Sequence, residues 1–222
     1  MRTLSRSCLM LLVLFCLVHH ANAGTIISPV AVINNTAGVV GDGISQITNA
    51  IDHSGLTIPF ISGVTDFNTY IGTNPTHSWI YVDSAEWFSR PGVTAGTVDF
   101  DLGAAYTVNQ LALWNEEFSG LLTLNVTTSN DPLFGTGTVV GNFNPTDNPF
   151  DQNYPAEVFA LASTTAQYVR FEMTGPQIPN RGTYLSIGEV AFDVTPIPEP
   201  TSLLLLASGL IGLGVAAWRR KK

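Results

Sequence analysis

Short stretches in which apolar residues recur at every second position dominate the middle of this chain. They are clearest in residues 122–128, 169–173 and 190–194. Because successive side chains of an extended strand point to opposite faces, each stretch can bury one face. Clusters of Gly, Pro, Asn and Asp lie between the stretches and favour turns. The pattern predicts an all-β fold, built as an antiparallel sandwich or barrel.

The segment 97–102 illustrates the two faces of one predicted strand. Its three apolar residues alternate with Asp99 and Asp101. We expect the apolar residues in the core and both aspartates in solvent. Gly103 follows and suits a turn that needs a positive φ. Residues 44–51 are the best candidate for a helical turn. Further strands are expected at 108–114, 138–143 and 158–161.

The C-terminal segment 196–222 has three successive parts. Three prolines at its start fix φ and lack the backbone N–H, so they end the preceding strand. Residues 202–218 carry no charge, and as a helix they would be about 25 Å long, just short of a hydrocarbon core of about 30 Å. Two arginines and two lysines end the chain, and such a cluster stays on the cytoplasmic side. We predict a transmembrane helix at 202–218.

The segment 196–222 resembles the PEP-CTERM sorting signal of Gram-negative bacteria. The resemblance rests on Pro198, Glu199 and Pro200, on the apolar span and on the basic end. It implies recognition by an exosortase in the inner membrane and export linked to exopolysaccharide production. The three residues would form a recognition motif in a substrate, not a catalytic site. The alternative is a single-pass membrane anchor with a proline-rich stalk.

The N-terminal segment 1–23 has the features of a secretory signal peptide. Arg2 and Arg6 precede the apolar stretch 8–18, which is too short to span a membrane. Small residues at positions 21 and 23 favour cleavage after Ala23. The Sec translocon and signal peptidase are therefore expected partners. Both cysteines of the chain lie in this segment, so the mature chain would have no disulfide and no cysteine-bound zinc.

The remaining residues, 24–195, are long enough for one domain with a sizeable core. They hold three arginines, no lysine and sixteen acidic residues, which gives a net charge of −13. Such a surface repels phosphate backbones, so nucleic-acid binding is excluded as a function. The many carboxylates are available to divalent cations.

Several short motifs of the domain occur in an order that resembles a discoidin, or coagulation-factor type C, domain. The motifs are an Asn-Ala-Ile-Asp turn, two tryptophans, a Val-Asp-Phe-Asp-Leu-Gly stretch, a Tyr-Val-Arg-Phe stretch and a closing Gly-Glu-Val strand, which lie at 49–52, 79 and 87, 98–103, 168–171 and 188–190. The resemblance covers residues 30–194 and implies a galactose-binding-like jelly roll. One departure is that Asp52-His53 stands where the family has Asp-Gly.

The same resemblance implies a structural calcium site. Asp52 and Glu189 would each supply a side-chain oxygen, and backbone carbonyls such as that of Ala50 would complete the shell. Calcium takes about six to eight oxygen ligands, so two carboxylates with carbonyls are suitable chemistry. The alternative is that both carboxylates are ordinary surface acids.

The resemblance also implies that ligands bind on loops at one end of the sandwich. The segment 79–90 is the richest such loop, because it combines aromatic rings, carboxylates and an arginine. Rings stack on the apolar faces of sugars while charged groups bond the hydroxyls. The expected saccharide contacts are Trp79, Asp83, Trp87 and Arg90. The alternative is that the aromatic residues pack in the core or at its rim.

Motifs of catalysis are missing from the sequence. It has no H-E-x-x-H, no G-x-S-x-G and no phosphate-binding loop. We therefore expect a non-catalytic exported protein of the cell surface or extracellular matrix that binds exopolysaccharide or envelope glycan. One alternative is a structural biofilm protein without a ligand pocket. Another is a glycan hydrolase, which needs only two carboxylates at the right separation.

Overall fold

The computed structural model describes residues 24–80, 85–177 and 182–197. The predicted signal peptide, the expected sugar contact Asp83, the sorting motif at 198–200 and the expected transmembrane helix lie outside these ranges. Within them, no helix is both long and apolar enough to cross a membrane.

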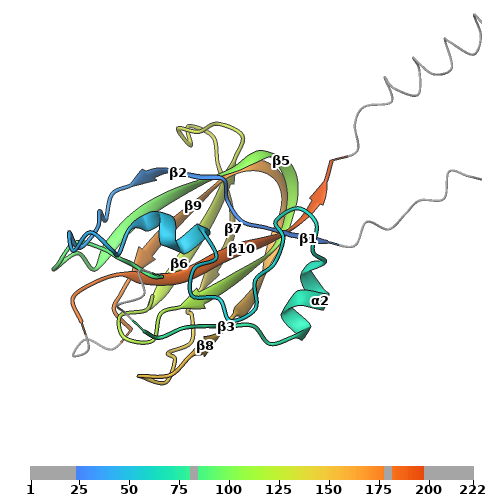
Figure 1. The fold of residues 1–222 in the computed structure, drawn as a ribbon. Coiled ribbons are helices and arrows are strands. Elements are labelled where there is room, and N and C mark those ends of the chain that lie inside the picture. The colour runs from blue at the N-terminus through green and yellow to red at the C-terminus, as the bar shows by residue number, and fades with distance from the viewer. Residues whose placement is uncertain (1–23, 81–84, 178–181, 198–222) are drawn as a thin grey trace, which may run out of the picture.

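The described chain is an all-β antiparallel sandwich, as predicted (Figure 1). The main sheet path runs β1-β10-β5-β9-β6-β7, with β2 paired to β5 and β4 paired to β10, and β3 pairs with β8. The elements are β1 (Thr25–Ile27), β2 (Ala31–Asn35), η1 (Ile47–Ile51), α2 (Phe67–Gly72), β3 (Thr76–His77), β4 (Trp87–Phe88), β5 (Ala95–Asn115), β6 (Thr123–Ser129), β7 (Thr138–Phe143), β8 (Tyr154–Pro155), β9 (Glu157–Thr174) and β10 (Ser186–Pro196).

Two long strands, β5 and β9, each pass through both layers of the sandwich. The first half of β5 pairs with β2, its second half pairs with β10, and β9 follows it along both halves. The β5–β9 register shifts between Asp101 and Tyr106, where the strands bend. Gly103 lies in this bend with a φ of 83°, which glycine adopts without a steric penalty. The predicted strands 97–102 and 108–114 are therefore parts of one continuous strand.

The core lies between the layers and is formed by the residues that the alternation predicts. Val98 and Phe100 are fully buried, and so are Phe171 and Phe192 from β9 and β10. The rings of Phe100 and Phe171 meet edge to face, with centroids 5.1 Å apart. Fully burying a side chain of this size contributes about 1.5–3 kcal/mol. The Phe171 ring also packs against that of Phe192, which pairs with the other half of β5, with ring centroids 6.2 Å apart, so the aromatic core connects the two layers.

The prediction of a solvent-exposed Asp99 was wrong. Its side chain is only 2 % exposed and accepts two hydrogen bonds from Arg170 on the neighbouring strand, at 2.7 and 2.8 Å. The face of β5 that carries Asp99 is covered by polar partners from β2 and β9, including Asn34. A charged group can be buried where it is paired in this way.

The predicted helical turn at 44–51 forms as the short 3-10 helix η1. A further helix, α2, was not predicted, because its six residues are too few to show a helical period. Asp66 caps α2 by accepting a hydrogen bond from the Thr69 N–H at 2.7 Å. The segment before α2 packs beside β1, and both lie at the end of the sandwich where β10 finishes (Figure 1).

Candidate functional site: an acidic aromatic pocket

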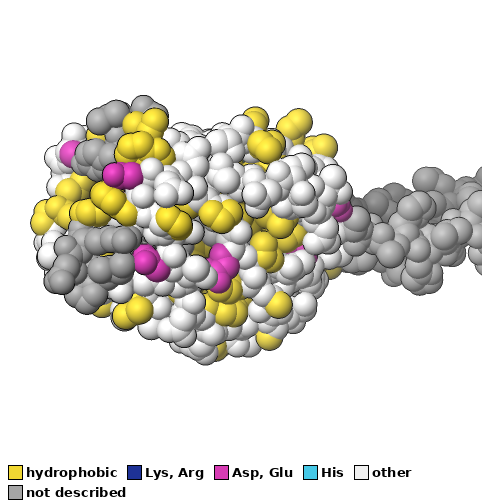
Figure 2. Space-filling view, turned by 90° about the horizontal axis from the view of Figure 1, so that it is seen from below, with side chains coloured by type: hydrophobic (Ala, Val, Ile, Leu, Met, Phe, Trp, Pro, Cys, Tyr) yellow, Lys and Arg dark blue, Asp and Glu magenta, His cyan; other side chains and the backbone are white. Residues whose placement is uncertain are grey.

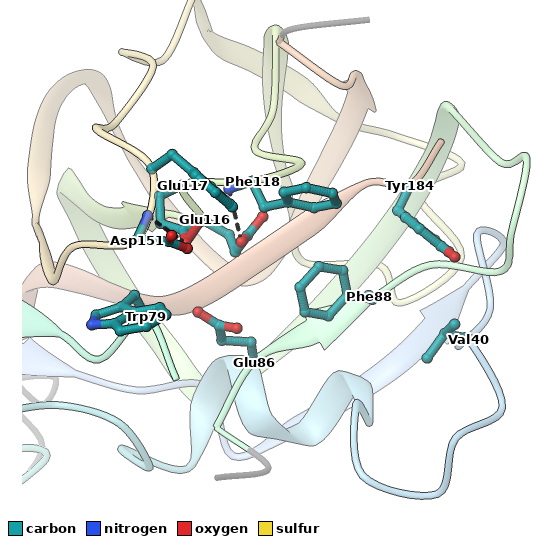
Figure 3. A pocket seen from close by; sticks show the side chains of 10 residues that line it. Val40, Trp79, Glu86, Phe88, Glu116, Glu117, Phe118, Asp151 and Tyr184 are labelled. Carbon is teal, nitrogen blue, oxygen red and sulfur yellow. Dashed lines mark hydrogen bonds between the residues drawn. The ribbon is translucent and has the colours of Figure 1, made fainter. Parts of the chain in front are cut away.

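A pocket of about 340 Å³ opens at the end of the sandwich where β10 begins (Figure 3). Five of its ten lining residues are aromatic and four are acidic. They come from β4 and from five segments far apart in the sequence, which follow β2, precede β4, follow β5, precede β8 and precede β10. The lining residues are Val40, Trp79, Glu86, Phe88, Glu116, Glu117, Phe118, Phe150, Asp151 and Tyr184.

The strand β4 decides which residues of the predicted ligand loop face the pocket. Trp87 and Phe88 pair with Ile187 and Ser186 of β10, so successive side chains point to opposite sides. Glu86 and Phe88 line the pocket, whereas Trp87 is fully buried in the hydrophobic core. The indole N–H of Trp87 donates to the carbonyl of Gly38 at 2.9 Å.

The four residues expected to contact sugar therefore have different locations. Trp79 lines the pocket and is 39 % exposed. Trp87 lies in the core, for the reason just given. Arg90 lies outside the pocket lining, and its guanidinium donates to the carbonyls of Thr36 and Ala37 at 3.2 and 3.4 Å. Asp83 is outside the described residues. Only Trp79 of the four is part of the described pocket.

Three glutamates on the pocket wall are almost completely buried. Glu86, Glu116 and Glu117 are each 3 % exposed. Glu116 is held by the turn that follows β5, since it accepts hydrogen bonds from the backbone N–H groups of Phe118 and Ser119 at 2.8 and 2.5 Å. The turn thus fixes a carboxylate at the pocket wall.

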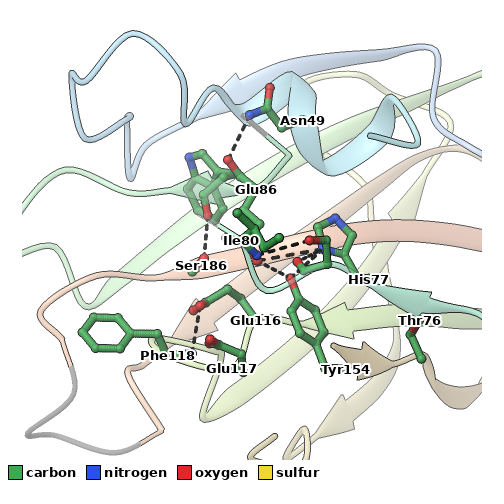
Figure 4. A network of polar contacts seen from close by, with 12 residues as sticks. Asn49, Thr76, His77, Ile80, Glu86, Glu116, Glu117, Phe118, Tyr154 and Ser186 are labelled. Carbon is green, nitrogen blue, oxygen red and sulfur yellow. Dashed lines mark hydrogen bonds and ion pairs between the residues drawn. The ribbon is translucent and has the colours of Figure 1, made fainter. Parts of the chain in front are cut away.

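Glu86 belongs to a polar network that extends behind the pocket (Figure 4). The hydroxyl of Tyr154 donates to Glu86 Oε1 at 2.6 Å and lies 2.9 Å from Nδ1 of His77. The rings of His77 and Tyr154 stack, with centroids 5.1 Å apart. Both of these residues are fully buried. The network therefore fixes the direction of the Glu86 carboxyl from the core side of the pocket.

Burial changes the acidity of these groups. It raises the pKa of Glu86 to about 7, against a lowering effect of the Tyr154 hydrogen bond. Burial also raises the pKa of Glu116 well above its usual range, and the nearby Glu86 carboxyl adds to the rise. Carboxyl groups with strongly raised pKa values inside a cleft are typical of functional sites.

Most of the pocket residues were not expected from the sequence. Glu116, Glu117 and Phe118 directly follow the predicted strand 108–114, so their position at a strand end was a usable signal. Phe150 and Tyr184 gave no such signal, because they lie in long loops whose course depends on the whole fold.

The residues of the expected calcium site come together at the end of η1. Ala50 is buried in η1, and Asp52 ends this helix. His53 adopts a φ of 66°, the left-handed conformation that the glycine of the family's Asp-Gly turn would adopt easily. The fully buried Glu189 reaches this turn, because its Oε2 accepts the His53 N–H at 2.8 Å.

The chemistry of this turn fits a hard cation at Glu189. Its second oxygen, Oε1, is buried without a hydrogen-bond partner among the described residues. Burial raises the pKa of Glu189 well above its usual range. Asp52 is exposed and accepts the Ser54 N–H at 2.8 Å. No cluster of three or more His, Cys, Asp or Glu side chains suited to a metal occurs in the described ranges, so backbone carbonyls would have to supply other ligands.

Comparisons with known proteins address the tail and the fold separately. Residues 196–221 match the family model of the PEP-CTERM protein-sorting motif. This match confirms the sorting motif expected at the C-terminus. A comparison with curated proteins gave no match.

Solved structures with the same fold include parts of two chitobiases. The C-terminal domain of a chitobiase from Bacteroides fragilis is 15% identical, with 78% of this chain and 99% of that chain covered at a TM-score of 0.52. A fragment of a putative chitobiase from Bacteroides thetaiotaomicron is 16% identical, with 75% and 89% covered at a TM-score of 0.53. At such identities the likeness shows the fold.

A family 32 carbohydrate-binding module of C. perfringens NanJ, solved with galactose, is also similar. It is 15% identical, with 76% of this chain and 98% of that chain covered, at a TM-score of 0.48. The two chitobiase parts share the fold of this chain, which supports the expected antiparallel β-sandwich.

Proposed function

We propose that this chain is an exported, non-catalytic protein that binds a glycan of the exopolysaccharide or cell envelope in the acidic aromatic pocket. The observation that carries the proposal is the pocket lining, in which aromatic faces and carboxylates converge on one cavity. Rings such as those of Trp79 and Tyr184 would stack on the apolar face of a sugar, and carboxyl groups would bond its hydroxyls.

The position of the pocket supports binding at a distance from the membrane. Tyr184 lies just before β10, whereas Pro196 ends β10 at the start of the sorting motif. An eleven-residue strand extends over about 36 Å, at about 3.3 Å per residue. A tail held by the inner membrane or by exosortase would therefore leave the pocket at the far end of the domain.

The surface charge is consistent with an exported binding protein. On the face seen in Figure 2, acidic side chains lie among scattered hydrophobic ones, and no arginine or lysine is visible among the described residues. Residues 24–195 hold three arginines and sixteen acidic residues, a net charge that repels anionic polymers. We expect a neutral or cationic glycan as ligand.

We also propose a structural calcium ion at the turn formed by Ala50, Asp52 and Glu189. The buried, unpartnered Oε1 of Glu189 supports this proposal. When bound, the ion would fix the turn at the end of η1 against Glu189 of β10. The residues of the chain would supply one or two carboxylate oxygens and the Ala50 carbonyl.

A glycan array on the mature chain, residues 24–222 in mild detergent, tests the glycan-binding proposal. We expect binding to a restricted set of glycans, and loss of it in Trp79→Ala and Tyr184→Ala. Leu133→Ala is the matched control, since Leu133 is 84% exposed and lies outside the pocket lining. Absence of binding to any glycan would favour a structural matrix protein. Release of shorter glycans during incubation would favour a hydrolase.

A further inference from the structure

Near the end of β10 that is remote from the pocket, an aspartate is buried with one carboxyl oxygen unpaired. Asp193 is 5% exposed. Its Oδ2 accepts a hydrogen bond from the side-chain amide of Gln110 at 3.0 Å, whereas Oδ1 has no hydrogen-bond partner among the described residues. A buried carboxyl oxygen without a donor costs free energy, so Oδ1 marks a site at which a donor would stabilise the fold.

The strand pairing shows from which side such a donor can come. β10 lies between β1 and β5 in the sheet (Figure 1), and Asp193 pairs with Gln110 on β5 and with Ile26 on β1. Residues two positions away from a directly paired residue are diagonal neighbours on the same face of the sheet. The carboxyl therefore reaches β5 through Oδ2, and Gly24 is its diagonal neighbour on the side of β1.

Gly24 lies directly against the unpaired oxygen. A Cβ atom at this position would stand 1.7 Å from Asp193 Oδ1 and 2.6 Å from its Cγ, so the side chain of any other residue would clash with the carboxyl. Because backbone single bonds are about 1.5 Å long, the α-carbon lies within about 3.2 Å of this oxygen and the α-nitrogen within about 4.7 Å. The nearest backbone nitrogen on this side is thus approached without an intervening side chain.

Gly24 is held in place on its other side. Its carbonyl accepts the N–H of Phe67 at 3.0 Å, and the N–H of Ile26 donates to the carbonyl of Thr65 at 2.9 Å. Rotation about the bond between the α-carbon and the carbonyl carbon moves the α-nitrogen while the bond to Phe67 stays intact. Glycine permits this rotation widely, so the nitrogen can turn toward Asp193.

The charges around this oxygen favour a cation over a neutral donor. Burial raises the pKa of Asp193, and the charge of Asp66 adds to the rise. Of the arginines that the structure describes, Arg90 donates to backbone carbonyls after β2 and Arg170 pairs with Asp99. Residues 24–195 contain no lysine. An amino terminus is a cation that this part of the chain can supply itself.

We propose that Asp193 binds the α-ammonium of Gly24 once the predicted signal peptide has been removed after Ala23. Before cleavage, the nitrogen of Gly24 is an uncharged amide with one N–H. Hydrolysis adds water across the peptide bond, which leaves a carboxylate on Ala23 and an amine on Gly24. This amine is mostly protonated at pH 7, since α-amino groups have pKa values of about 7.7–8.0. It then offers three donors, one of which bonds Oδ1.

The ion pair links processing at the two ends of the chain. β1 has three residues, which pair with β10 over residues 192–194, so a contact just before β1 strengthens a short strand. β10 continues to Pro196, where the match to the sorting motif begins. Removal of the N-terminal segment therefore stabilises the end of the strand that carries the C-terminal tail.

Selective acetylation of the α-amine tests the ion pair directly. Lys221 and Lys222 are the two lysines of the chain, and exchanging both for arginine leaves the α-amine of the mature chain, in mild detergent, as its one primary amine. Only the uncharged amine reacts with acetic anhydride, so an ion pair slows the reaction at pH 7. We expect acetylation to be at least about threefold slower than in Asp193→Asn, which keeps the shape of the side chain.

The control variant is Asp131→Asn, which removes the same charge in the loop before β7. It should acetylate at the wild-type rate, which excludes a general effect of the acidic domain. A chain that begins at Ala23 places its amine one residue further from Asp193 and should acetylate at one rate with or without Asp193→Asn. Equal rates for the chain that begins at Gly24 and its Asp193→Asn variant would overturn the inference.

Thermal melts give a second measurement that does not depend on the folding of Asp193→Asn. A chain that begins at Gly24 should melt about 2–4 °C above one that begins at Ala23, as expected for one charge-assisted hydrogen bond in a domain of this size. In the Asp193→Asn background the two chains should melt together. Equal melting of both chains with Asp193 present would overturn the inference.

N-terminal sequencing of the exported chain checks the position of cleavage. We expect Gly24 as the first residue, because this start places the ammonium against the buried carboxyl. Another first residue would overturn the inference. None of these measurements involves a glycan, so the proposed glycan binding is tested separately.

Discussion

Arg170 of β9 forms a two-pronged ion pair with Asp99 of β5. The guanidinium Nε donates to Oδ1 at 2.7 Å and Nη2 donates to Oδ2 at 2.8 Å. Asp99 is 2 % exposed and Arg170 is 26 % exposed. The Phe134 ring lies under the guanidinium, 4.2 Å from its carbon to the ring centroid. This pair joins the central strands of one layer.

Replacing the cation of this pair should destabilise the domain. We expect Arg170→Met to lower the free energy of unfolding by about 2–3 kcal/mol, less than a fully buried pair because Arg170 is partly solvated. Urea unfolding measures the change. Arg170→Lys keeps the charge without the second hydrogen bond, so it should lie between wild type and Arg170→Met. A loss below about 0.5 kcal/mol in both variants would contradict a structural role for the pair.

The Asp99 site also shows how far sequence patterns reach. Alternation correctly placed Val98 and Phe100 in the core, because a strand with one apolar face has only one way to bury it. It could not show that the opposite face of β5 is covered as well. That cover comes from β2 and β9, which pair with β5 from distant parts of the sequence.

The candidate site was predictable only where its residues are close together in the sequence. Of the loop 79–90, which the clustering of aromatic and charged residues singled out, Trp79 lines the pocket, whereas Trp87 and Arg90 do not. The inward direction of Trp87 depends on its pairing with Ile187, a hundred residues further on. Pairing with such a distant segment leaves no local pattern, so the two-residue strand β4 was missed.

The raised pKa of Glu86 predicts a dependence of stability on pH. A carboxyl whose pKa rises from 4.5 when unfolded to about 7 when folded binds more protons in the folded state. The contribution of Glu86 to the free energy of unfolding is therefore fully present below pH 4.5, and it is lost as pH rises through 7. We expect the free energy of unfolding to fall by on the order of 1–3 kcal/mol between pH 4.5 and 8 from this group.

Urea unfolding at pH 4.5, 6 and 8 measures this dependence. Glu86→Gln cannot titrate, so its stability should change less over the same range. Asp131→Asn removes an acid outside the pocket and should keep the wild-type slope. A Glu86→Gln slope equal to that of wild type would show that the pKa of Glu86 is not raised.

Calcium should stabilise the mature chain if the turn at the end of η1 holds an ion. We expect millimolar calcium to raise the melting temperature by several degrees, since a ligand that binds only the folded state stabilises it. Glu189→Gln and Asp52→Ala should remove most of the rise. Asp151→Asn, an acid of the pocket, should leave it intact. A melting temperature independent of calcium in the wild type would exclude the site.

Exchanging the acidic residue of the sorting motif should stop processing. In a Gram-negative host with an exosortase, the wild-type chain should appear as a shortened form at the surface or in the medium. Glu199→Ala should leave a longer form in the inner membrane, because residues 202–218 still hold the chain there while recognition is lost. Blots of membrane, surface and medium fractions measure both forms. Exchanging Thr201 for serine is the control, as it changes a neighbouring residue outside the Pro-Glu-Pro motif. Equal shortening of the wild type and Glu199→Ala would show that the motif is not read, and that the tail is an ordinary anchor.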